Sequence, residues 1–311
     1  MRTGYSRAMS TKSSKKSSKK KHSKKKSSST EHPRFEVPPR EALRADGVDL
    51  EHFDRGATPG WSHGKKAAEH ELLRRGEELS ELQERLFAEG RTGGSRSVLL
   101  VLQGMDTAGK GGIVRHVVGM VDPQGVDHSS FGAPTPEELA HDFLWRIRKE
   151  LPRAGRLGVF DRSHYEDVLI AKVDALVPAD VVEARYDEIN AFEAELVAAG
   201  TTIVKVALFV SLDEQKARLG ERLERPDKHW KFDPSDLAAR ARWPEYQEAY
   251  QAVLDHTSTD VAPWHVIPAD HKWYARLTIT QLLLDAFRDL DLGWPPATFD
   301  VEEQKRLLAQ A

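Results

Sequence analysis

The chain lacks several features on which whole classes of protein depend. It has 311 residues and no cysteine, which excludes disulfide bonds, thiolate zinc sites and cysteine nucleophiles. No apolar run approaches the ~20 residues that a membrane-spanning helix requires, and no hydrophobic secretory segment opens the sequence. We therefore expect a cytoplasmic protein that does not associate with a membrane.

Acidic residues are absent from the first thirty positions. Residues 1–30 contain nine Lys and two Arg, whereas the whole chain has a formal net charge of −3, so the remainder carries an excess of acid. The Lys/Ser run within residues 12–29 cannot bury apolar surface, and we expect residues 1–33 to form a disordered tail. Such a tail either binds polyanions or only solubilises the chain, and its composition fits both roles.

Hydrophobic periodicity divides the rest of the chain into three parts. Residues 34–92 form an N-terminal extension that ends in a helix over about 65–89, with leucines at helical spacing. Residues 93–295 alternate strands with helices, and residues 296–311 form a C-terminal tail. We expect strands at 98–103, 126–131, 156–161, 203–210 and 264–268. Between and after them we expect helices at 110–120, 136–150, 164–172, 179–199, 213–225, 236–255 and 271–290. This alternation predicts an α/β fold, with a five-stranded parallel sheet covered by helices on both faces.

A glycine-rich loop follows the first of these strands. The segment 104–112 (GMDTAGKGG) has the spacing of a P-loop, or Walker A motif, whose backbone N–H groups and lysine bind phosphate. Gly111 stands where Ser or Thr usually holds Mg²⁺, and Asp106 is a candidate to hold the metal instead. The phosphate-binding candidates here are Gly104, Gly109, Lys110, Gly111 and Gly112.

A second signal resembles the Walker B element. The apolar run 157–160 ends in Asp161, which places a carboxylate at the edge of the sheet where ligands bind in such folds. Asp106 and Asp161 are candidates to share one Mg²⁺, and Arg162 to hold phosphate oxygens. Asp161 is otherwise explained as a helix cap. Glu166 orients either the waters of the metal or the acceptor, or it simply belongs to an acidic first helical turn.

The third signal is a basic stretch beyond the fourth strand. Arg218, Arg222 and Arg225 share one helix face, and Lys228 and Lys231 follow. We interpret residues 212–242 as a helical lid that closes cations over phosphates, because phosphoryl transfer spreads negative charge over the transferred group. The alternative is a solvent-exposed helix face whose charged side chains form i,i+4 ion pairs.

Together these residues resemble the second family of polyphosphate kinases, the polyphosphate:nucleotide phosphotransferases, from about residue 35 to residue 290. Taken singly a P-loop is only moderately specific, but this ordered set of motifs is highly specific. The supporting segments are 102–112, 122–126 (DPQGV), 142–146 (DFLWR), 160–168 (FDRSHYEDV), 226–231 (PDKHWK) and 257–264.

The resemblance implies a thymidylate-kinase-like P-loop α/β/α fold with a helical lid. It implies inorganic polyphosphate as donor, adenine nucleotides as acceptors, Mg²⁺ or Mn²⁺ as cofactor, and a homodimer or homotetramer. The SHYED run is similar to the class III branch, whose members are associated with both AMP and ADP. By this resemblance the Asp106 and Asp161 carboxylates bind the metal and the acceptor phosphate. Lys110 and Arg162 bind the transferred phosphoryl group, and Arg218 and Arg222 close over the phosphates from the lid. Arg115 faces the phosphate chain.

One position departs from the family pattern, in which a lysine commonly follows the Ser-Phe pair. Gly132 follows Phe131 here, so that polyphosphate contact is not carried over. Two other functions compete with this interpretation. One is an ATP-dependent nucleotide or small-molecule kinase on the same fold, and the other is a polyanion-binding protein with a P-loop remnant.

Overall fold

The structure of the protein is a computed structural model, which describes residues 32–311. The expected Lys/Ser tail lies outside the described residues up to position 31. Pro33–Ala311 form one compact unit.

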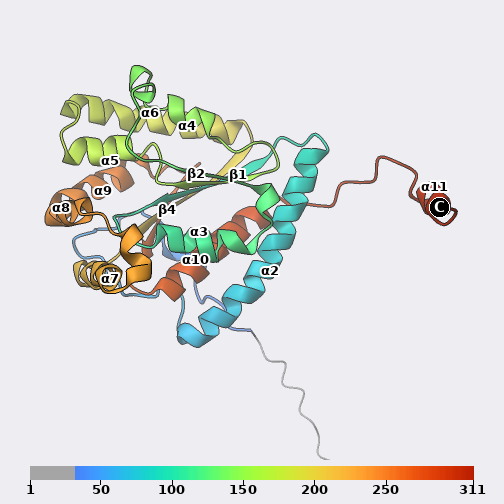
Figure 1. The fold of residues 1–311 in the computed structure, drawn as a ribbon, viewed down its shortest axis with the longest axis horizontal. Helices are drawn as coiled ribbons and strands as arrows, with labels where there is room; N and C mark the ends of the chain where they lie inside the picture. The colour runs from blue at the N-terminus through green and yellow to red at the C-terminus, as the bar shows by residue number, and fades with distance from the viewer. Residues whose placement is uncertain (1–31) are drawn as a thin grey trace, which may run out of the picture. The chain divides into compact units, whose positions relative to one another are not determined.

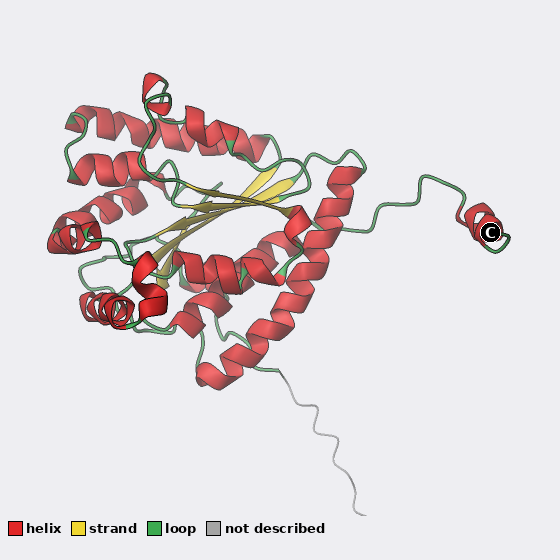
Figure 2. Ribbon diagram, in the orientation of Figure 1, coloured by secondary structure: helices red, strands yellow, loops and turns green. Residues whose placement is uncertain are grey.

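A five-stranded sheet forms the centre of this unit (Figure 2). Its strands lie in the order β2-β3-β1-β4-β5, and every neighbouring pair is parallel. The sheet predicted from the sequence is therefore confirmed. The strands are β1 (Ser97–Gln103), β2 (Val126–Ser130), β3 (Leu157–Asp161), β4 (Thr201–Phe209) and β5 (Trp264–Pro268).

Two helical layers cover the two faces of the sheet (Figure 1). One core cluster joins α5 (Glu166–Val173), α6 (Ala179–Ala198) and α9 (Trp243–Thr257) to one face. The other joins α2 (Gly64–Arg91), α3 (Lys110–His116) and α10 (Lys272–Asp289) to the opposite face. Every residue of β1 is buried, as expected for a central parallel strand that is apolar on both faces.

The remaining elements are short or lie outside these layers. They are α1 (Pro39–Ala42), α4 (Trp145–Lys149), α7 (Leu212–Glu224), α8 (Ser235–Ala241), α11 (Val301–Leu308), and four 3₁₀ turns at Val118–Met120, Pro123–Gly125, Glu138–Ala140 and Pro226–Lys231. Among residues 32–311, no helix has the length and apolar character needed to cross a membrane.

Two of the expected long helices are interrupted. The helix predicted over 136–150 is wrong: it is reduced to a 3₁₀ turn and α4, because the Asp142 carboxylate accepts a hydrogen bond from the Leu144 N–H (3.1 Å) and forms a turn. The helix predicted over 236–255 is divided into α8 and α9 at Arg242. Pro244 stands in the first turn of α9, where its missing N–H and fixed φ suit a helix start and not a helix interior.

The topology places a binding site at the end of β1. From β1 the chain passes first to β2 and then to β3 on one side, and later to β4 and β5 on the other. In open α/β sheets ligands bind outside the carboxyl ends of the strands at such a reversal. Leu102 of β1 is paired with Asp161 of β3, so Asp161 ends its strand beside the start of the glycine-rich loop.

Candidate active site

The glycine-rich loop turns sharply between β1 and α3. Gly104 has φ +148°, and a Cβ there would lie 2.6 Å from the backbone oxygen of Leu208. Gly109 caps α3 with φ +119°. These two positions require glycine. In contrast, a Cβ at Gly111 would meet no atom within 4 Å. Packing therefore does not require glycine here in place of Ser or Thr.

Lys110 lies at the centre of the loop and is buried. Its Nζ donates hydrogen bonds to the backbone oxygens of Gly104 (2.5 Å) and Met105 (3.4 Å). Burial lowers the pKa of Lys110, and the nearby Asp106 carboxylate opposes that shift. The ammonium group is therefore desolvated and held at the mouth of the loop by backbone dipoles.

Asp106 and Arg162 connect the loop to the end of β3. Arg162 Nη2 donates to Asp106 Oδ1 at 2.9 Å, and Arg162 has the left-handed φ of +65° that is strained for a non-glycine residue. Burial lowers the pKa of Arg162, but the carboxylates of Glu166 and Asp106 outweigh it and the pKa is raised. Burial raises the pKa of Glu166, which stands in the first turn of α5. Cations and carboxylates thus alternate around the loop.

The carboxylates of Asp106 and Asp161 suit a divalent cation with hard-ligand preference. Both line the same cavity. Over the described part of the chain, two groups of three His, Asp or Glu side chains bring their ligand atoms within 4.8 Å of one another. Neither group includes Asp106 or Asp161. A metal ion at Asp106 and Asp161 would therefore complete its shell with water and phosphate oxygens.

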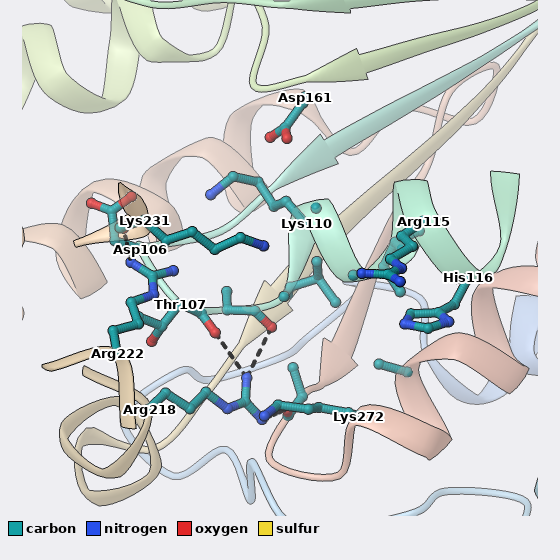
Figure 3. A pocket seen from close by; sticks show the side chains of 18 of the residues that line it. Asp106, Thr107, Lys110, Arg115, His116, Asp161, Arg218, Arg222, Lys231 and Lys272 are labelled. Atoms are coloured by element: carbon teal, nitrogen blue, oxygen red, sulfur yellow. Dashed lines mark hydrogen bonds between the residues drawn. The ribbon is translucent and has the colours of Figure 1, made fainter. Parts of the chain in front are cut away.

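Arg218 of α7 is buried against the loop and not directed outward. Its Nη1 donates to the backbone oxygens of Thr107 (2.9 Å) and Ala108 (3.2 Å) (Figure 3). Its Nη2 donates to those of Ala269 (2.7 Å) and Asp270 (3.0 Å), and its Nε to Glu214 (2.7 Å). All five N–H groups of this guanidinium therefore have acceptors within the protein.

The cation expected beside it, Arg222, is also engaged. Its Nη1 donates to Asp236 Oδ2 at 3.0 Å and to the backbone oxygen of Lys231 at 2.9 Å. Burial raises the pKa of Asp236, the neighbouring Asp106 carboxylate adds to the shift, and Arg222 opposes it. Asp236 thus brings a further carboxylate to the site from α8, which our sequence analysis missed.

Residues 163–165 of the SHYED segment are buried in the protein and do not line the cavity. His164 and Tyr165 are buried and belong to a polar cluster with Glu193 of α6 and Lys205 of β4. The Lys205 ammonium donates to Glu193 (2.5 Å) and to the Tyr165 hydroxyl (2.8 Å), and the Tyr165 hydroxyl donates to Glu193 (2.7 Å). The Lys205 and Glu193 side chains are each at most 1 % exposed. This cluster packs directly behind the start of α5, where Glu166 stands.

These residues surround a cavity of about 630 Å³. Nine Lys or Arg and five Asp or Glu line it, so the cavity carries an excess of positive charge in an acid-rich protein. Twelve of the fourteen site residues expected from the sequence line it, whereas Gly104 and Glu166 do not. The twelve are Asp106, Gly109, Lys110, Gly111, Gly112, Arg115, Asp161, Arg162, Arg218, Arg222, Lys228 and Lys231.

Three lining residues had no distinguishing sequence signal: Asp236, Lys272 and Arg276. Lys272 and Arg276 fall in the first turns of the helix expected over 271–290, but nothing in the sequence indicates that this end of α10 reaches the loop. Helix α10 packs against α3, and a Cβ at Gly112 would lie 3.9 Å from Arg276 Nη2. Only this packing reveals their place.

Comparison with known proteins identifies relatives over most of the chain. The family model for polyphosphate kinase 2 matches residues 62–292. The chain is 46 % identical over 254 residues to the AMP/ADP-polyphosphate phosphotransferase of Meiothermus ruber, covering 81 % of this chain and 94 % of that protein. It is 42 % identical to the ADP-polyphosphate phosphotransferase of Rhodopseudomonas palustris over 74 % of this chain and 82 % of that one. The crystal structure of polyphosphate kinase 2 from Arthrobacter aurescens superposes with a TM-score of 0.87, at 53 % identity, over 89 % of this chain and 99 % of that one.

Proposed function

This chain belongs to the polyphosphate kinase 2 family, and we propose that it transfers the terminal phosphoryl group of inorganic polyphosphate to AMP and to ADP, forming ADP and ATP. The observation that carries the proposal is the cation-lined cavity at the end of β1, with Lys110, Asp106 and Asp161 around it. Relatives named as AMP/ADP- and ADP-polyphosphate phosphotransferases share most of its length.

Direct in-line transfer is the simplest mechanism for this site. An oxygen of the acceptor nucleotide phosphate attacks the terminal phosphorus of the donor, a new P–O bond forms, and the bond to the next phosphate of the chain breaks with that phosphate as leaving group. The protein contributes positioning and charge neutralisation. Lys110 and Arg162 bind the transferring group, and their partly desolvated surroundings strengthen these contacts.

The donor set of Asp106 and Asp161 fits Mg²⁺, or Mn²⁺ in its place, because both are oxygen ligands close to the phosphate-binding loop. When bound, the ion neutralises charge on the phosphates. The Thr107 hydroxyl offers a further phosphate contact, since it is buried and has no hydrogen-bond partner among residues 32–311.

We propose that residues 212–242 form a lid, in which two cations bind protein groups and two are open to the substrate. Arg218 and Arg222 bind protein groups. Arg218 donates to carbonyl oxygens of the glycine-rich loop, and Arg222 donates to Asp236 within the lid. Lys228 and Lys231 line the cavity without an ion-pair partner in the described chain and are the cations available to the donor. We further propose that residues 34–92 form an extension to a core of residues 93–295, that the tail binds polyanions and that the chain forms a homo-oligomer.

A comparison of donors tests this function. Purified protein with Mg²⁺ and ADP is supplied with polyphosphate, or with GTP as a nucleotide donor, and ATP is measured. ATP formed from polyphosphate at a rate well above that with GTP is expected. Turnover only with the nucleoside triphosphate would contradict the proposal and identify an ordinary nucleotide-dependent kinase.

A further inference from the structure

Residues 162–165 connect strand β3 to helix α5, and we refer to them as the β3–α5 turn. Its first residue, Arg162, lines the cavity and has the left-handed φ of +65°. The other three residues, Ser163, His164 and Tyr165, are each at most 1 % exposed and do not line the cavity. A non-glycine residue keeps such a strained conformation only where its surroundings over-determine it. The contacts of the three buried residues therefore bear on the position of Arg162.

One set of contacts joins the turn to the end of β1. The Arg162 N–H donates to the backbone oxygen of Leu102 at 3.0 Å. The Gln103 side-chain amide donates to Ser163 Oγ at 3.0 Å, and the Tyr165 N–H donates to the same oxygen at 3.3 Å. Gln103 is the last residue of β1 and directly precedes the glycine-rich loop. The turn is thus aligned with the strand that leads into the loop.

A second set of contacts joins the turn to one buried carboxylate. Glu193 Oε1 of α6 accepts from the Tyr165 hydroxyl at 2.7 Å and lies 3.3 Å from His164 Nε2. Lys205 Nζ of β4 donates to Glu193 Oε2 at 2.5 Å and to the Tyr165 hydroxyl at 2.8 Å. It also donates to the backbone oxygen of Thr257, the last residue of α9, at 2.8 Å. The turn is therefore connected to α6, β4 and α9 at once.

A gain in stability is a weak reason for a buried ion pair at this place. Burial alone would raise the pKa of Glu193, but the Lys205 charge and the His164 hydrogen bond outweigh it, and the pKa is lowered. The carboxylate is therefore ionised, and both charges of the pair have lost their hydration. Apolar residues of similar volume are often as stabilising as such a pair. What hydrogen-bonded charges add is one fixed arrangement of the groups that bind them.

We propose that Tyr165 is a positioning residue, which fixes the β3–α5 turn and thereby directs the Arg162 guanidinium at the transferred phosphoryl group. Glu193 and Lys205 hold the Tyr165 hydroxyl in place. The inference rests on the proposed function, in which Arg162 binds the transferring group. Lys110 is held separately, by backbone oxygens of the loop. Loss of the Tyr165 contacts is therefore expected to lower the rate of transfer and to leave the binding of substrates nearly unchanged.

The first test is Tyr165→Phe, which removes the hydroxyl and keeps the ring that packs on Trp264. We expect kcat for ATP formation from polyphosphate and ADP to fall by about tenfold, with KM for both substrates within about twofold of the wild type. The matched control is Tyr274→Phe, because the Tyr274 hydroxyl donates to the backbone oxygen of Pro59 at 2.8 Å in a separate core cluster. The control is expected to keep the wild-type kcat. Thermal unfolding compares the stabilities, and an unchanged kcat in Tyr165→Phe, or an equal loss in both variants, would overturn the proposal.

A double-mutant cycle tests whether Tyr165 acts through Arg162. Tyr165→Phe is introduced into the wild type and into Arg162→Ala, and kcat is measured in all four proteins. If Tyr165 positions Arg162, its replacement has little left to disturb once that guanidinium is gone, and we expect a further loss of less than about twofold. The same tenfold factor in both backgrounds would show that Tyr165 does not act through Arg162.

The double variant Lys205→Met/Glu193→Leu separates positioning from stability. Apolar side chains fill the space of the ion pair but form no hydrogen bond with the Tyr165 hydroxyl. We therefore expect unfolding measurements to show a stable protein whose kcat stays about tenfold below the wild type. Recovery of stability and kcat together would show that the cluster is only structural. If the wild type uses only a nucleoside triphosphate as donor, the proposed function fails, and the same cycle measured with that donor still decides the role of Tyr165.

Discussion

Arg218 Nη1 donates to the backbone oxygen of Thr107 at 2.9 Å, and this contact ties α7 to the phosphate-binding loop. The same guanidinium holds the backbone after β5 through Ala269 and Asp270. One buried arginine therefore fixes the relative positions of the loop, the lid helix and the fifth strand. Thr107 has a strained left-handed φ of +65°, which such a contact stabilises.

Replacement of Arg218 is expected to damage the loop more than the affinity for any one phosphate. Arg218→Ala leaves several buried carbonyl oxygens without donors, and we expect a loss of about 3 kcal/mol in unfolding free energy. Arg218→Lys keeps the charge but not the five N–H groups, and we expect it to lower kcat at unchanged charge. Urea unfolding and kinetics check both, with the exposed Arg225→Ala as control. A stable Arg218→Ala protein with wild-type kcat would contradict this role.

The buried pair of Lys205 and Glu193 supports the start of α5. Lys205→Met removes one charge and leaves the Glu193 carboxylate buried, for which we expect a loss of about 3–5 kcal/mol in unfolding free energy. The double variant Lys205→Met/Glu193→Leu is expected to recover a large part of that loss, because no uncompensated charge remains. Chemical unfolding of the two variants measures this. Equal stabilities of the single and double variants would argue against a coupled pair.

His265 predicts a pH dependence of stability. Burial in β5 lowers its pKa to about 4, against ~6.5 in the unfolded chain. Between these values the unfolded state binds more protons than the folded state, so stability falls as the pH decreases from 6.5 to 4, by about 3 kcal/mol in total. The fall in unfolding free energy over this range is expected to be smaller in His265→Gln. Parallel curves for the two proteins would show that another group is responsible.

Much of the fold could be predicted from this sequence, because β1 and most of β3 are uninterrupted apolar runs that end at motifs with strong local meaning. Val98–Leu102 precedes the glycine-rich loop, and Asp161 ends another such run. The interrupted helices were harder. The turn at Asp142 depends on a side-chain hydrogen bond that competes with helix formation, and hydrophobic periodicity does not reveal such a bond.

The site was predictable where a residue acts through its place in a motif, and not where it acts through tertiary packing. Lys110 and Asp161 follow from local sequence. Arg218 lies on a basic helix face, but sequence alone does not reveal whether its guanidinium faces a ligand or backbone carbonyls. Asp236 and Arg276 reach the cavity only because α8 and α10 pack beside the loop, which no local pattern encodes.

Metal removal is expected to abolish turnover. EDTA should stop ATP formation, and excess Mg²⁺ or Mn²⁺ should restore it, because the phosphates and the two carboxylates repel one another without a cation. Asp161→Asn removes one anionic ligand and is expected to raise the Mg²⁺ concentration for half-maximal rate by about tenfold. A titration of rate against free Mg²⁺ measures this shift. An unchanged midpoint would remove Asp161 from the metal site.

The most direct test of the central claim is ATP formation from polyphosphate, Mg²⁺ and either AMP or ADP, in the wild type and in Lys110→Ala. Loss of one buried cation that contacts the transferring group is expected to cost at least about 100-fold in kcat, while thermal unfolding shows an intact fold. We predict ATP from both acceptors with the wild type and its near-complete loss in the variant. Wild-type turnover in a folded Lys110→Ala protein would contradict the account.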